Sequence, residues 1–136
     1  MKDNIIKWEA GFEIPSNSEV LKIIDDTEGL KILLKELDSK RVFQIFFSDS
    51  LAYRNMNESY LLKIWSSIDD NILGNILYKI ENSSYIDYFN DMSLGLYSSW
   101  EIKHYAIHTG QDCIDVLTTV PPVVEYKTAG TPPAED

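Results

Sequence analysis

The sequence has a single cysteine, and this and other shortages exclude several classes of protein. One cysteine cannot form an internal disulfide, so nothing in the chain indicates an oxidising compartment. Its six glycines form no G-x-G-x-x-G or G-x-x-x-x-G-K phosphate-binding loop, and we therefore predict no cofactor. No apolar run reaches the roughly 18–20 residues of a membrane helix. The first fifteen residues include Asp3 and Glu9 and have no apolar stretch of signal-peptide length, so we expect a cytoplasmic protein.

Negative charge dominates the composition, with 22 acidic residues against 12 basic ones and a formal net charge of −10. A surface of this sign repels phosphate backbones and anionic lipids, so we expect no nucleic-acid partner and no membrane partner. It attracts a basic protein, and it also keeps a protein soluble, which is the simpler interpretation. With 136 residues, 44% of them hydrophobic, the chain can fill the core of one domain.

Alternating apolar and polar residues predict that much of the chain is extended. A helix over 29–37 is the competing interpretation there, because leucine, lysine and glutamate are good helix formers. We prefer a strand, since the next segment, "RVFQIFFSD", is strongly β and needs a neighbour. Strands are predicted at 5–14, at the start of the segment 20–49, and at 30–37, 41–49, 76–82, 101–109, 113–119 and 121–127, the last an edge strand.

Two segments have the spacing of helices. In 57–68, "NESYLLKIWSSI", Asn57 can cap a helix whose apolar residues recur at helical intervals. A second helix begins after Ser83 or Ser84 and ends at Gly95. The order of elements predicts an α+β domain over residues 1–127, with an antiparallel or mixed sheet and two helices packed on one face. The polar, proline-bearing residues 128–136 are predicted to be a disordered tail.

The stretch "KHYAIHTGQDCIDVL" holds both histidines and the only cysteine. His104 and His108 have the i, i+4 spacing of a helical zinc site, but the local alternation has period two. On a strand, four residues span about 13 Å, too far for one ion whose bonds are about 2 Å long. We therefore predict no metal site. A hairpin around Gly110 brings His108 or Thr109 nearest Cys113, so a catalytic dyad of Cys113 with a histidine is the enzymatic alternative.

The acidic pairs have a simpler interpretation as turns. Residues 25–26 and 69–70 are both "DD", and Asp112 and Asp115 are three positions apart. Paired carboxylates can bind magnesium or serve as acid and base. Adjacent aspartates on a strand point to opposite faces, however, and beside glycine or asparagine they favour a solvated turn.

Two predicted loops carry candidate partner-binding residues. Tyr53 and Arg54 lie between a strand and a helix, and tyrosine with arginine is typical of the energetic centre of protein interfaces. Alternatively, Arg54 ties neighbouring carboxylates together. Tyr97 and Trp100 lie in a loop before a strand, where they form either a contact patch or a cover over a sheet edge. With Asp112 these four residues are the predicted partner-binding set.

The phrases "AYR", "ENSSYIDYF" and "KHYAIHTGQDCIDVL" followed by "PP" resemble a group of small, acidic, cytoplasmic bacterial proteins. The group includes uncharacterised open reading frames and immunity proteins of toxin–immunity pairs, and the resemblance spans about residues 28–125. It implies a non-enzymatic binding protein, a monomer or homodimer, that occludes a basic, nucleic-acid-cleaving toxin. A regulatory protein-interaction module is a further alternative. The chain departs from the pattern after "PP", where an apolar or aromatic end would be expected, and the resemblance supplies no active site.

Overall fold

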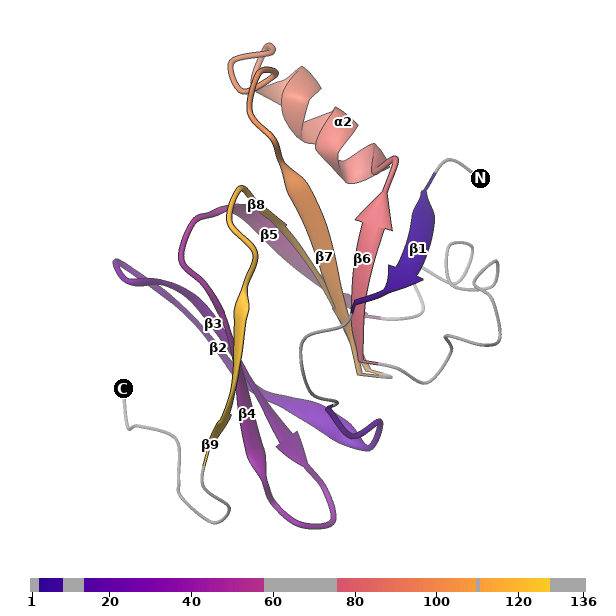
Figure 1. Ribbon diagram of the computed structural model, residues 1–136, viewed down its shortest axis with the longest axis vertical. Helices are drawn as coiled ribbons and strands as arrows, with labels where there is room; N and C mark the ends of the chain where they lie inside the picture. Colours follow the sequence, from indigo (N-terminus) through magenta and orange to yellow (C-terminus); the bar gives the residue numbers. More distant parts are fainter. Residues whose placement is uncertain (1–2, 9–13, 58–75, 110, 128–136) are drawn as a thin grey trace.

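The computed structural model describes residues 3–8, 14–57, 76–109 and 111–127, and there the chain forms two antiparallel sheets and one helix (Figure 1). The five-stranded sheet has the order β1 (Asn4–Lys7), β6 (Leu77–Glu81), β7 (Lys103–His108), β8 (Asp112–Thr118) and β5 (Ser50–Asn57). The four-stranded sheet has the order β2 (Ser18–Asp26), β3 (Gly29–Glu36), β4 (Val42–Phe47) and β9 (Val123–Lys127).

The main hydrophobic core joins the two sheets. On β3 the alternate residues Leu30, Ile32 and Leu34 are buried, and the register pairs them with Phe47, Ile45 and Phe43 of β4. The five-stranded sheet contributes alternate residues of β7 and β8 to the same cluster: Tyr105, Ile107, Ile114 and Val116. Strict alternation over these strands follows from the pleat, which points every second side chain to the core.

Among the described strands the chain passes between the sheets three times, from β1 to β2, from β4 to β5 and from β8 to β9, and the last two crossings are adjacent. β4 pairs with β9 in one sheet, while β5, which follows β4 after two residues, pairs with β8 in the other. Thr118 connects these crossings: its hydroxyl lies 3.0 Å from the Asp49 carbonyl oxygen and 2.9 Å from the Val120 carbonyl oxygen. Because a buried hydroxyl needs partners, these two hydrogen bonds hold the β4–β5 and β8–β9 connections together where each passes to the other sheet.

The helix α2 (Ser84–Met92) joins β6 to β7 and lies beside one end of the five-stranded sheet (Figure 1). Ser83 is its N-cap, and the Ser83 hydroxyl accepts from the Ile86 N–H at 3.0 Å. This confirms the predicted second helix, and of the two predicted caps, Ser83 and Ser84, Ser83 is the capping residue. The strand at 30–37, preferred over a helix, is also confirmed as β3, and the predicted edge strand is β9.

The predicted α+β class with two helices on one face of a sheet is wrong. The described chain is mostly β, with two antiparallel sheets and one short helix. Residues 51–57, expected to be a loop leading into a helix, belong to the strand β5. Apart from Asn57, the last residue of β5, the predicted helix over 57–68 lies outside the described residues, as does the predicted tail over 128–136.

Candidate functional site

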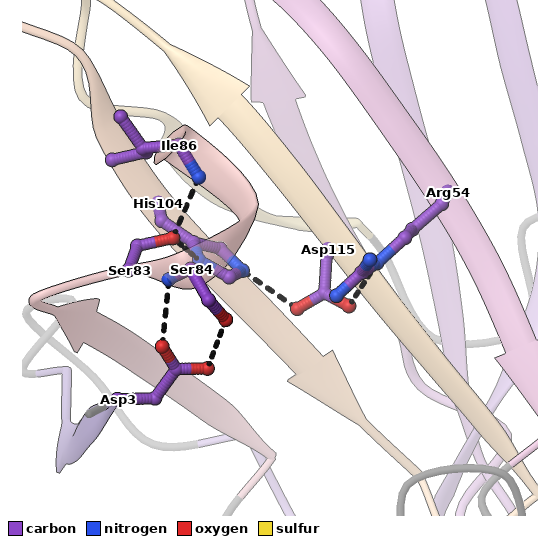
Figure 2. A network of polar contacts seen from close by, with 7 residues as sticks. All are labelled: Asp3, Arg54, Ser83, Ser84, Ile86, His104 and Asp115. Carbon is purple, nitrogen blue, oxygen red and sulfur yellow. Dashed lines mark hydrogen bonds and ion pairs between the residues drawn. The ribbon is translucent and has the colours of Figure 1, made fainter. Parts of the chain in front are cut away.

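A chain of buried polar side chains crosses the outer face of the five-stranded sheet, beneath the start of α2 (Figure 2). His104 on β7 is its centre: Nδ1 lies 2.7 Å from the Ser83 hydroxyl, and Nε2 lies 2.7 Å from Oδ1 of Asp115 on β8. His104 is 3% exposed and Ser83 is 5% exposed. Because a buried imidazole needs partners at both nitrogens, these two contacts satisfy it completely.

Arg54 is the last member of this series of polar side chains and binds Asp115. Its Nε donates to Oδ2 of Asp115 at 3.0 Å, so the two carboxylate oxygens serve two different donors. Its guanidinium carbon lies 4.1 Å from the centroid of the Tyr85 ring, a cation–π contact. Burial raises the pKa of Tyr85 above its ordinary value of 10.0, and the Arg54 cation opposes part of that shift.

Tyr85 and Ser83 connect this series of polar side chains to the helix α2. The Tyr85 ring meets the His104 imidazole edge-on, with centroids 5.5 Å apart. At the next position Ser84 binds the carboxylate of Asp3, with its N–H 2.7 Å from one oxygen and its hydroxyl 3.1 Å from the other. An acidic group at a helix N-terminus is stabilising, so Asp3 anchors the first turn of α2 to the start of the chain. We call Ser83, His104, Asp115 and Arg54 the His104 network.

The His104 network has the residue types of a serine-hydrolase triad. Because a carboxylate only accepts, we assign the hydrogen to Nε2, which faces Asp115, and Nδ1 can then accept from the Ser83 hydroxyl. In the serine proteases the roles of the two ring nitrogens are reversed: the serine faces Nε2 and the aspartate faces Nδ1. A nucleophile also has to reach its substrate, whereas Ser83 is buried and its oxygen already accepts the Ile86 N–H. This arrangement suits a structural connection better than nucleophilic catalysis.

Cys113 and His108 are neighbours across the β7–β8 hairpin, and His108 is one of the two residues, with Thr109, that the sequence predicted nearest Cys113. The register places His108 directly opposite Cys113. Cys113 is not in a disulfide, and 0% of its surface is exposed. It packs in a small cluster on the outer face of the sheet with Tyr78, Ile80 and Ala106. A thiol in these surroundings behaves as a small apolar side chain.

The five predicted partner-binding residues do not form one group. Arg54 is ion-paired with Asp115 in the His104 network, as in the alternative interpretation that this arginine ties neighbouring carboxylates together. Tyr53 is exposed on the neighbouring position of β5, and Asp112 accepts from the Asn55 side chain at 3.2 Å.

Tyr97 and Trp100 do lie together. Their rings meet edge-on at 4.7 Å between centroids, and Tyr97 in turn lies 5.4 Å from Phe89 of α2. Trp100 is 48% exposed. These aromatic contacts pack the segment between α2 and β7 against the helix and hold its backbone in place.

Sequence reasoning missed the His104 network because Ser83 and Asp115 were interpreted separately, as a helix cap and as part of an acidic pair. A signal was present in the predicted hairpin. Once His108 faces Cys113, the register puts His104 opposite Leu117, and Asp115 is then its diagonal neighbour, within reach of a long side chain.

No three histidine, cysteine or acidic residues in the described part of the chain are grouped so that they could hold a metal ion. No helix among the described residues is long and apolar enough to span a bilayer. Comparisons with protein-family models, with curated proteins and with solved structures gave no match to this chain.

Proposed function

We propose that the chain is a non-enzymatic binding protein that neutralises a basic, nucleic-acid-cleaving toxin, as an immunity protein does. One observation is the main support for this proposal: every ionisable or nucleophilic group of the His104 network has a partner within the protein. These groups are therefore not available for catalysis, and the surface is the part of the protein that can act, by binding.

The charge of the chain supports a basic partner. A formal net charge of −10 accelerates encounter with a cationic surface and disfavours partners of the same sign. A toxin that cleaves nucleic acid needs a basic groove for its substrate, and an acidic domain of this size is suited to cover that groove. The resemblance of "AYR", "ENSSYIDYF" and the β7–β8 segment to small acidic bacterial proteins points in the same direction.

The test is recovery and inhibition of the partner. The tagged chain is purified from its native host under gentle lysis, and the bound protein is identified, isolated and assayed for cleavage of DNA and RNA. We expect a basic protein whose nuclease activity falls to background at one equivalent of this chain, with affinity falling at least tenfold between about 50 and 300 mM salt. Absence of any bound protein, or undiminished cleavage at equimolar ratio, would contradict the proposal.

An enzymatic alternative is favoured by two observations, the Ser83–His104–Asp115 connectivity and the His108–Cys113 register. Activity-based labelling decides it. A fluorophosphonate reacts with an activated serine, and iodoacetamide at pH 7 reacts with an activated thiolate. We expect neither probe to label the folded protein, while urea-unfolded protein should react with iodoacetamide at Cys113. Labelling of Ser83 or Cys113 in the folded state would favour a hydrolase or transferase instead.

A further inference from the structure

The segment 88–100 displays an unusual number of large apolar side chains. Leu94 is 94% exposed and Leu96 is 72% exposed, and three more members of the segment are also exposed: Tyr88, Met92 and Trp100. Tyr88 and Met92 are four residues apart on α2, so they share one face of the helix. We call these five residues the turn patch. Single exposed apolar residues are ordinary, but five in one short segment make this segment a candidate interaction site.

The backbone of Leu94 makes the patch harder to explain as chance. Leu94 has φ 56°, in the left-handed region, where an L side chain costs about 1–2 kcal/mol. The helix ends there in a Schellman motif, in which Leu94 N–H donates to the Asp91 carbonyl at 3.1 Å and Gly95 N–H donates to the Asn90 carbonyl at 2.9 Å. Glycine is the usual residue at the position of Leu94. A strained leucine with almost no contact to the protein does not serve the fold, and strain of this kind accumulates at functional positions.

The charges around the turn patch identify its occupant. Residues 84–102 contain three acidic residues, all exposed, and no basic one: Asp87, Asp91 and Glu101. Lys103, just beyond, pairs with Glu101 at 3.4 Å, so the segment with this lysine keeps a net negative charge. A second copy of the chain would bring like charges together, and an anionic membrane would be repelled in the same way. The complementary surface is an apolar pocket with lysines and arginines at its rim.

We propose that the turn patch docks into an apolar pocket with a basic rim on a partner protein, with Leu94 and Leu96 as the inserted side chains. This inference deepens the proposed function, on which it rests, by naming the contact surface on this chain. The aromatic series Phe89, Tyr97 and Trp100 holds the turn in place before binding, so little conformational entropy is lost when the leucines insert.

The first test uses designed 14-residue peptides and NMR titration of the isotopically labelled full chain. A helical leucine–lysine peptide offers both properties of the proposed pocket, a serine–lysine peptide offers charge alone, and a leucine–glutamate peptide offers apolar surface with the wrong sign. At 50 mM salt we expect the leucine–lysine peptide to shift the amides of 88–100 and the Trp100 indole, and to bind at least tenfold more tightly than either control. Equal binding of the serine–lysine peptide, or shifts centred elsewhere, would overturn the inference.

The variants separate the patch from general surface properties. Leu94→Asn keeps a residue that tolerates the left-handed conformation, and combined with Leu96→Ser it should weaken peptide binding at least tenfold. Leu37→Ser, at an exposed leucine in the β3–β4 loop, is the matched control and should bind within twofold of the natural chain. Leu94→Gly should raise the urea midpoint and still weaken binding, because it relieves the strain and removes the inserted side chain. If the Leu94→Asn, Leu96→Ser variant and the Leu94→Gly variant both bind the peptide like the natural chain, the patch has no docking role.

Three further outcomes would also overturn this assignment. Sedimentation could show a dimer that Leu94→Asn abolishes, which would make a second copy the occupant. Neutral phosphatidylcholine vesicles could shift the Trp100 indole as the peptide does, which would indicate a membrane. The partner recovered from the host could bind the Leu94→Asn, Leu96→Ser variant as tightly as the natural chain, in which case the proposed function stands without this surface. The two proposals can also separate in the other direction. If the leucine–lysine peptide binds the turn patch but no partner is recovered from the host, the docking surface is supported and the proposed function is contradicted.

Discussion

At the scale of single residues, the buried carboxylate of Asp115 determines how the outer face of the sheet is held. It accepts from His104 at 2.7 Å and from Arg54 at 3.0 Å, so one buried side chain links β5, β7 and β8. Asp115→Ala should lower the free energy of unfolding by about 3 kcal/mol, because His104 is left as a buried donor without its acceptor. Urea denaturation with linear extrapolation measures this loss.

Asp112→Ala is the matched control on the same strand. Within the described residues its carboxylate accepts from the exposed Asn55 side chain at 3.2 Å, so the expected loss is about 0.5 kcal/mol or less. A loss for Asp115→Ala as small as that for Asp112→Ala would mean that the His104 network contributes little to the fold.

Two tyrosines should make the protein sensitive to alkali. Burial raises the pKa of Tyr105 and of Tyr85 above 10.0, the ordinary value of the phenol. The unfolded chain therefore loses these protons first, so stability is unaffected below about pH 10 and falls as the pH rises further. Urea midpoints measured between pH 8 and pH 11 should show this fall, and Tyr105→Phe should reduce its slope. An unchanged slope in that variant would show that Tyr105 ionises alike in both states.

Residue-scale prediction from sequence worked where the reason was local. The helix cap was narrowed to Ser83 or Ser84, because an oxygen at such a position satisfies a nearby N–H, and the structure shows Ser83. The neighbour of Cys113 was narrowed to His108 or Thr109 by the short hairpin loop, and the register shows His108. The role of Arg54 stayed open between an ion pair and an interface anchor, because its partner Asp115 is 61 positions away and only the pairing of β5 with β8 brings them together.

At the scale of elements, Gly29 decides whether the β2–β3 hairpin can close. It has φ 139°, and a Cβ there would lie 2.5 Å from the Phe47 carbonyl oxygen and 2.9 Å from the Phe46 ring. Gly29→Ala should therefore cost at least about 3 kcal/mol, from backbone strain together with a clash against β4 that cannot be relieved by a side-chain movement.

Gly95→Ala provides the comparison, since it tests a left-handed backbone without a clash. Its φ is 75°, and the nearest atom to an added Cβ would be the Ser98 hydroxyl at 4.0 Å. The expected cost is about 1 kcal/mol. Equal losses for the two variants in urea denaturation would show that the approach of Phe47 to Gly29 adds nothing beyond the backbone strain.

The strand β5 shows why one element was misassigned. Its sequence, "SLAYRNMN", has no regular alternation, because at this edge strand the exposed Asn55 lies opposite the core residue Ile114, where the pattern would require an apolar residue. The strands β3 and β4 lie inside their sheet and face the core along their whole length, so their pattern predicted them correctly.

At the scale of the whole molecule, the fold class depended on information that periodicity does not carry. Alternation identifies strands but not the sheet that each one joins. The chain changes sheet between β1 and β2, then between Phe47 and Ser50 within a connection that resembles an ordinary hairpin turn, and again between Thr118 and Val123. Since those crossings divide the strands between two packed layers, a sequence that predicted most strands correctly still predicted one sheet with helices covering it.

The excess of acidic residues predicts that moderate salt stabilises the isolated protein. Ten uncompensated negative charges repel one another, and the Debye length shortens from about 30 Å at 0.01 M salt to about 10 Å at 0.1 M. Salt also screens the exposed ion pairs, among them Glu36–Arg41 and Glu28–Lys31, but such pairs contribute only about 0–1 kcal/mol each. The Arg54–Asp115 pair is largely buried and is screened less.

Repulsion should therefore outweigh the lost ion pairs, and raising sodium chloride from 0.01 to 0.3 M should raise the urea midpoint. Glu19→Gln combined with Asp25→Asn removes two exposed negative charges from β2, so this variant should be more stable at low salt and respond less to added salt. The same addition of salt should weaken a complex with a basic partner, because there the screened interaction is attractive. A midpoint that falls as salt is added would mean that attraction between opposite charges within the fold exceeds the repulsion, and the acidic surface would then need no partner to explain it.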